Sequence, residues 1–120
     1  MIAIWEPSLS VGNPVSDAEH RRVINLLNEI EVALRVGAPD LVVETALETL
    51  NAAIDAHFAR DERPHGEHAA IAATARRLLD VCRQSGAAPI DRRSLLYLAG
   101  RWIGHMGRRE SAFIPSRLAG

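Results

Sequence analysis

Hydrophobic residues along the chain recur at steps of three and four positions, which is the spacing of one face of an α-helix. In the first such segment this face consists of His20, Ile24, Leu27 and Leu34. Ser16 and Glu19 have the spacing of a capping box at a helix start. Gly37 and Pro39 supply the stop. The pattern therefore predicts a first helix over residues 17–36.

Three further segments show the same periodicity. In the second, the apolar stripe runs through Val43, Leu47, Leu50, Ile54, His57 and Asp61. Asp40 is a candidate cap before this stripe, and the Arg63–Gly66 segment interrupts it. Gly86 ends the third segment, whereas a capping Asp91 opens the fourth and Pro115 closes it. These signals predict helices over residues 40–62, 66–84 and 91–113.

The helical pattern also predicts the fold class. No window alternates hydrophobic and polar residues with period two for long enough to predict a strand, so we expect an all-α protein. Four amphipathic helices joined by short connections favour an up-down-up-down four-helix bundle, formed as a single domain by residues 1–120. Trp5, Leu9 and Val11 predict that residues 1–15 form an extended N-terminal arm that packs across the bundle.

Charge and composition limit the classes of partner that we expect the chain to bind. The chain has 14 Lys and Arg residues against 15 Asp and Glu residues, which argues against nucleic acid or an anionic membrane as a partner. Its start lacks the features of a signal peptide, and no stretch approaches the length needed to span a bilayer. We therefore expect a cytoplasmic protein. The single cysteine, Cys82, is expected to act as a small hydrophobic residue on a helix face.

All five histidines fall where the predicted helices point inward. A neutral imidazole is a common metal ligand, whereas a histidine facing a core loses its hydrogen bonds to water. One core histidine is more often structural, but five on converging faces, with two acids about one turn away, favour metal binding. The candidate ligands are His20, His57, Asp61, His65, His68, His105 and Glu110. This set suits iron, manganese or zinc and is too large for one ion, so a dinuclear centre is predicted.

Several short motifs carry a family resemblance. They are Trp5 with Leu9-Ser-Val-Gly12, Asp17-Ala-Glu-His20 with Asn28, His57-Phe-Ala-Arg-Asp61-Glu62, Glu67-His68, and Trp102-Ile-Gly-His105-Met-Gly-Arg-Arg-Glu110. With them the chain resembles the hemerythrin family, in particular its single-domain bacterial members, over nearly its whole length. The resemblance implies a hemerythrin-like bundle that binds dioxygen reversibly at two non-heme iron ions with an oxo or hydroxo bridge. Storage, delivery and sensing of oxygen are the implied uses.

The resemblance also implies roles for the candidate residues. One iron would be bound by His20 and His57. The other would be bound by His65, His68 and His105. Asp61 and Glu110 would bridge the two ions, and an oxygen pocket would be lined by Ile24, Leu27, Ile54 and Trp102.

This sequence departs from the family pattern at the acids and at the third helix. Asp61 stands where the family has a glutamate and Glu110 where it has an aspartate, so Glu62 is an alternative ligand on the second helix. His65 and His68 are three positions apart and follow Asp61 closely, which indicates a shortened, remodelled ligand region. Alternatively, the second and third helices form one long kinked helix that is exchanged in a homodimer; otherwise the protein is a monomer or an unswapped dimer.

The sequence is compatible with two other functions. No nucleophile has a base at a suggestive spacing, so an oxygen-binding protein is favoured over an enzyme. An exposed di-iron site would instead support a peroxidase or a nitric oxide scavenger. A helical bundle with a degraded metal site would act as a regulatory or interaction module.

Overall fold

The protein is all-helical in the computed structural model, which describes residues 2–60 and 66–106. Its four α-helices are α1 (Pro14–Arg35), α2 (Asp40–Arg60), α3 (Gly66–Ser85) and α4 (Arg92–His105), and a short 3-10 helix, η1, covers Pro7–Leu9. None of the described residues forms a strand. The predicted all-α fold class is confirmed, and four packed helices are compatible with a helical bundle.

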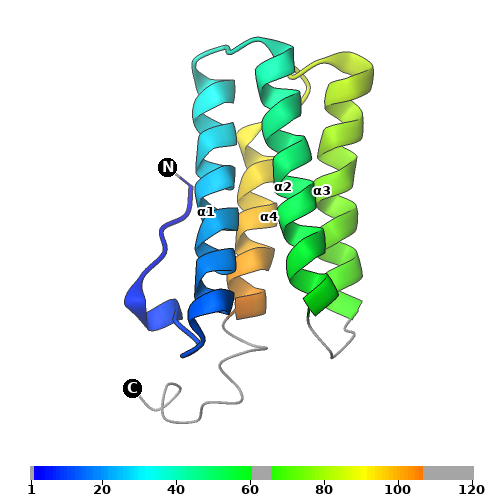
Figure 1. Cartoon of the computed structure of the whole chain (residues 1–120). Helices are drawn as coiled ribbons and strands as arrows, with labels where there is room; N and C mark the ends of the chain where they lie inside the picture. The colour runs from blue at the N-terminus through cyan, green and yellow to red at the C-terminus, as the bar shows by residue number, and fades with distance from the viewer. Residues whose placement is uncertain (1, 61–65, 107–120) are drawn as a thin grey trace.

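The four helices lie side by side (Figure 1). Helix α2 contacts α1 and α3, and α4 also contacts both of these helices. The start of α1, the end of α2, the start of α3 and the end of α4 all lie at the lower end of the molecule in Figure 1. Residues near these four helix ends are therefore brought to the same level, although they are distant in the sequence.

Helix α1 begins at Pro14 and not at the predicted residue 17. The Asn13 side chain caps the helix by accepting hydrogen bonds from the amides of Val15 (3.0 Å) and Ser16 (3.2 Å). Pro14 suits the first helical position because this position needs no amide donor and the proline ring fixes a helical φ. The predicted capping box at Ser16 is wrong because this asparagine and proline start the helix earlier.

The other helix boundaries follow the sequence more closely. Helix α4 is capped as predicted: Asp91 accepts a hydrogen bond from the Ser94 amide (2.9 Å). Asp40 is the first residue of α2 instead of its cap, and its carboxylate accepts a hydrogen bond from the amide of Ala87 (2.9 Å). Residues 61–62 and 107–113, where the second and fourth helices were predicted to end, lie outside the described residues.

The core takes hydrophobic side chains from every helix, among them Leu27, Ile54, Ile71 and Leu98, each at most 1% exposed. Burying one such side chain stabilises the fold by about 1.5–3 kcal/mol. Asn51 is a polar member of this core, and its amide donates to the carbonyls of Leu47 (2.9 Å) and Ala75 (3.1 Å), which connects α2 to α3. Cys82 is buried, as predicted, and burial with the nearby carboxylates raises its thiol pKa.

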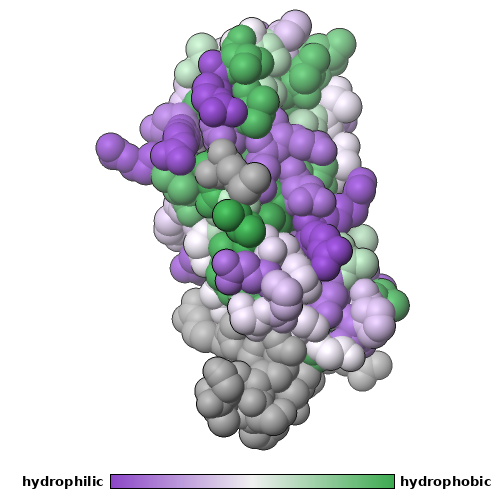
Figure 2. Space-filling view, turned by 90° about the vertical axis from the view of Figure 1, so that its left-hand side faces the viewer, coloured by the Kyte–Doolittle hydropathy of each residue, from purple (hydrophilic) through white to green (hydrophobic). Residues whose placement is uncertain are grey.

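Residues 2–13 lie along α1, on the face that Figure 2 shows. Ala3 and Val11 are buried there, and Trp5 packs against the core with the Arg21 guanidinium 4.2 Å from its ring centre. Asp17 accepts hydrogen bonds from the Val11 amide (2.9 Å) and the Ser10 hydroxyl. These contacts join the N-terminal segment to α1.

The outer surface mixes hydrophobic and hydrophilic residues (Figure 2). Hydrophobic residues gather at its upper end in that view, and beside the turn between α1 and α2 the side chains of Val36 and Leu41 are 69% and 71% exposed. Within the described ranges, no helix has the length and hydrophobicity required to cross a membrane.

Candidate metal centre

Three of the predicted ligands come together at the lower end of the four helices. His20 lies near the start of α1, His57 in the last turn of α2, and His105 in the last turn of α4. Their exposed fractions are 0%, 4% and 0%. The convergence follows from the arrangement of the helices, which places these three helix ends at one level (Figure 1).

The three imidazoles meet through the same ring nitrogen. The Nε2 atom of His57 is 3.2 Å from that of His20 and 3.4 Å from that of His105. Two nitrogen ligands of one tetrahedral ion, each at about 2.05 Å from the metal, lie about 3.3 Å apart. One ligand atom from each histidine lies within 4.8 Å of the others. The spacing therefore fits three ligands of a single ion.

The proton on His57 is placed by a carboxylate. Nδ1 of His57 lies 2.7 Å from Oε1 of Glu19. An ionised carboxylate only accepts hydrogen bonds, so Nδ1 is the donor and carries the proton. In the neutral ring, Nε2 then presents its lone pair toward His20 and His105. Metal-binding histidines typically donate a hydrogen bond to a carboxylate from the ring nitrogen that does not bind the metal, as Nδ1 of His57 does here.

Glu19 is itself held by Arg60. The guanidinium donates from Nε to Oε2 (2.9 Å) and from a terminal nitrogen to Oε1 (2.7 Å). Burial raises the pKa of the Glu19 carboxyl, but the hydrogen bonds and charges of Arg60 and His57 outweigh burial and hold this pKa below its ordinary value. Glu19 therefore stays ionised beside the histidines.

This role of Glu19 was not predicted from the sequence, in which Glu19 was assigned to a capping box. A signal was present, because Glu19 directly precedes the first candidate ligand on α1. Neighbours on a helix differ by about 100° in direction, so one can face the core while the next faces the adjoining helix. Here His20 faces the core and Glu19 reaches α2.

Aromatic side chains surround the cluster. Trp102 is fully buried, and its ring centre lies 5.7 Å from His20, 5.4 Å from His57 and 5.4 Å from His105. Its indole Nε1 donates to the carbonyl of His20 (3.3 Å). Phe58 adds a ring 5.3 Å from His105. The other residues predicted to line an oxygen pocket, Ile24, Leu27 and Ile54, are buried in the core.

His68 lies beside the cluster and not in it. Its ring stacks on Phe58 with centres 4.0 Å apart and planes 4° apart, and it makes an edge contact with His105 at 5.2 Å. The side chain is half-buried, at the edge of the group. The four remaining candidate ligands, Asp61, Glu62, His65 and Glu110, lie outside the described residues.

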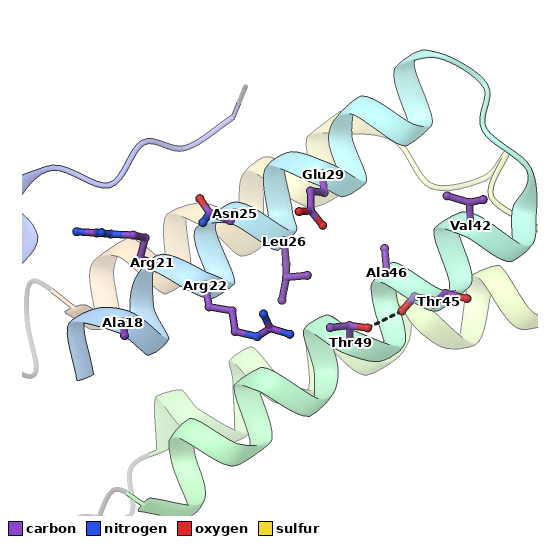
Figure 3. A pocket seen from close by; sticks show the side chains of 10 residues that line it. All are labelled: Ala18, Arg21, Arg22, Asn25, Leu26, Glu29, Val42, Thr45, Ala46 and Thr49. Carbon is purple, nitrogen blue, oxygen red and sulfur yellow. Dashed lines mark hydrogen bonds between the residues drawn. The ribbon is translucent and has the colours of Figure 1, made fainter. Parts of the chain in front are cut away.

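A groove of about 590 Å³ lies between α1 and α2 (Figure 3). Leu26 and Ala46 contribute apolar surface to it, and Arg22 extends from α1 toward α2. The groove is lined by Ala18, Arg21, Arg22, Asn25, Leu26, Glu29, Val42, Thr45, Ala46 and Thr49, and none of the predicted ligands is among these residues. Among the described residues, a group of three or more potential metal ligands is found at His20, His57 and His105, away from this groove.

Comparison of the chain with models of protein families, with curated proteins and with solved structures found no match.

Proposed function

We propose that the protein is a hemerythrin-like, up-down-up-down four-helix bundle with an extended N-terminal arm, and that it binds dioxygen reversibly at a non-heme di-iron centre. The observation that carries the proposal is the convergence of His20, His57 and His105, three buried histidines whose Nε2 atoms face one another.

The donor set suits iron. Imidazole nitrogens bind ferrous iron well, and His57 has the proton placement that a metal ligand needs. His20, His57 and His105 would hold the first ion, since their spacing fits a single metal. The sequence resemblance implies His65, His68 and His105 for the second ion; we keep His65 and His68 there and move His105 to the first ion, because its Nε2 lies 3.4 Å from that of His57. Asp61 and Glu110 would bridge the two ions, as the resemblance implies. Two ferrous ions would supply the two electrons that hold dioxygen at the site and would recover them when dioxygen is released.

The surroundings support binding of a small apolar molecule. Trp102 and Phe58 place aromatic rings against the histidines, and the apolar core residues Ile24, Leu27 and Ile54 lie in the same interior. An apolar, water-poor site slows the loss of electrons to solvent and favours reversible binding over irreversible oxidation.

A second candidate is a di-iron peroxidase or nitric oxide scavenger. The observation in its favour is His68, a half-buried imidazole in contact with His105 at the edge of the cluster. Its partial exposure places solvent at this edge of the cluster, and a di-iron site that solvent and small molecules can reach would support turnover of peroxide or nitric oxide.

Anaerobic loading with Fe²⁺ tests the proposal. We expect about two iron ions per chain and a visible absorption band that appears with oxygen and fades when oxygen is removed. The variant H57A should lose most of the iron, whereas Asn25→Ala, an exposed change on α1, should retain it. Rapid irreversible oxidation would favour the scavenger. Failure of the wild-type protein to retain iron would overturn both di-iron functions.

A further inference from the structure

We propose that Glu19 is a positioning residue for the metal centre. Its carboxylate, held by Arg60, fixes the tautomer and ring orientation of His57 so that Nε2 faces His20 and His105. This inference rests on the proposed metal-binding function, and it deepens it by naming a residue that sets metal affinity without touching the ion.

The first step is the tautomer. A neutral imidazole carries one proton, on either Nδ1 or Nε2, and only the Nδ1-protonated ring offers Nε2 to a metal. The hydrogen bond from His57 Nδ1 to Glu19 Oε1, 2.7 Å long, stabilises that form, because an ionised carboxylate accepts a hydrogen bond from the Nδ1–H group and cannot donate one. Glu19 thus selects the form of His57 that is ready to bind.

The second step is the ring orientation. His57 belongs to the last turn of α2 and Glu19 to α1, so the hydrogen bond between them spans two helices. One nitrogen of the ring is tied to α1 while the other lies 3.2 Å and 3.4 Å from its two counterparts. With Nδ1 anchored, rotation of the imidazole away from His20 and His105 would break a charge-assisted hydrogen bond.

The third step is the anchoring of Glu19. Its side chain is 26% exposed, so water would compete for the carboxylate if nothing else held it. Arg60 prevents this by binding both oxygens at 2.7 Å and 2.9 Å, in the two-point geometry that fixes a carboxylate plane. Arg60 therefore acts on His57 through Glu19, and its loss should have a smaller effect than loss of Glu19.

Metal titration measures the effect on binding. Zn²⁺ and Co²⁺ are titrated into the metal-free wild-type protein and into E19Q, E19A and R60Q, with affinity read by calorimetry and the Co²⁺ site by its visible spectrum. Loss of a carboxylate behind a ligating histidine weakens metal binding by roughly 10–100-fold. We expect a loss of this size for E19A and E19Q and a smaller one for R60Q.

Glu29→Gln is the matched control, because Glu29 is an exposed acid on the same helix. The metal affinity of this variant should equal that of the wild type. E19Q preserves the shape of the side chain, so the comparison does not depend on E19A being well folded. Wild-type affinity in both Glu19 variants would overturn the inference.

Nitrogen NMR of the imidazoles in the metal-free protein separates this inference from the proposed function. We expect the His57 proton on Nδ1 in the wild type and in E29Q, and a shift of the proton toward Nε2 in E19A. An unchanged His57 tautomer in E19A would overturn the role of Glu19. If the wild type instead binds neither ion, the metal function fails, while the NMR result still decides whether Glu19 sets the His57 tautomer.

Discussion

Asn28 shows how one side chain attaches a whole segment to the helices. Its Oδ1 accepts hydrogen bonds from the amides of Ile2 (2.9 Å) and Ala3 (3.1 Å), and its Nδ2 donates to the carbonyl of Ala3 (2.7 Å). Asn28 is among the residues that carry the family resemblance, but the sequence assigned it no role. The amide group is suited to this task because it offers a donor and an acceptor side by side.

Replacing Asn28 should release the N-terminal segment. We expect Asn28→Ala to lower the free energy of unfolding by about 1–3 kcal/mol, because three hydrogen bonds are lost and partly buried backbone groups lose their partners. Urea unfolding measures this change, and hydrogen exchange of the Ala3 amide reports the release directly. Asn25→Ala is the control, since Asn25 is exposed on the same helix. Equal stability and equal Ala3 protection in the two variants would contradict the prediction.

The turns that end α1 and α3 each contain a glycine with positive φ. Gly37 follows α1 with φ of +70°, and Gly86 follows α3 with φ of +78°. A side chain at Gly37 would meet no atom within 4 Å, whereas a Cβ at Gly86 would lie 2.7 Å from a carboxylate oxygen of Asp40. The sequence predicted both helix ends from these glycines. The contact between Gly86 and the start of α2 depends on the packing of the two helices.

This difference predicts unequal costs for two identical substitutions. Gly37→Ala should lower stability by about 1–2 kcal/mol, the cost of a left-handed conformation for an L-residue. Gly86→Ala should cost more, because it also displaces the Asp40 carboxylate from the Ala87 amide. Thermal or urea unfolding gives both values. In an Asp40→Ala background the extra cost at Gly86 should disappear; an extra cost that persists there would show that Asp40 is not its cause.

At the scale of the whole molecule, the three histidines connect α1, α2 and α4 at one end of the bundle. An ion bound by all three would join helices that are distant in sequence. Such a site exists only in the folded chain, so the free energy of metal binding adds to the free energy of folding.

Metal should therefore raise the unfolding temperature. A metal present at 100 times its dissociation constant stabilises the folded state by about 2.7 kcal/mol. We expect Zn²⁺ to raise the midpoint of thermal unfolding of the wild type and a chelator to reverse the increase. The variant H105A should show little or no increase, because it leaves two of the three ligands. An equal increase in wild type and H105A would place the stabilising ion elsewhere.

Most of the fold was predictable from local signals. Helical periodicity, the cap at Asp91 and the glycines after α1 and α3 are properties of short segments, so the four helices were recognisable from the sequence. The start of α1 was misplaced because the prediction relied on Ser16 and Glu19, whereas Asn13 caps the helix and Pro14 begins it. Which polar side chain caps a helix depends on what each one binds in the folded protein, and Glu19 of the predicted capping box binds His57 and Arg60 instead.

The candidate site was likewise predictable from the sequence only in part. The sequence by itself determined that His20, His57 and His105 lie on the inner faces of their helices, because burial follows from periodicity. Only the tertiary structure decided that His20, His57 and His105 meet through Nε2, that His68 stacks on Phe58 beside them, and that Glu19 reaches across to His57. Helical periodicity predicts which face of its helix a side chain lies on, whereas the distance between atoms on different helices depends on how those helices pack.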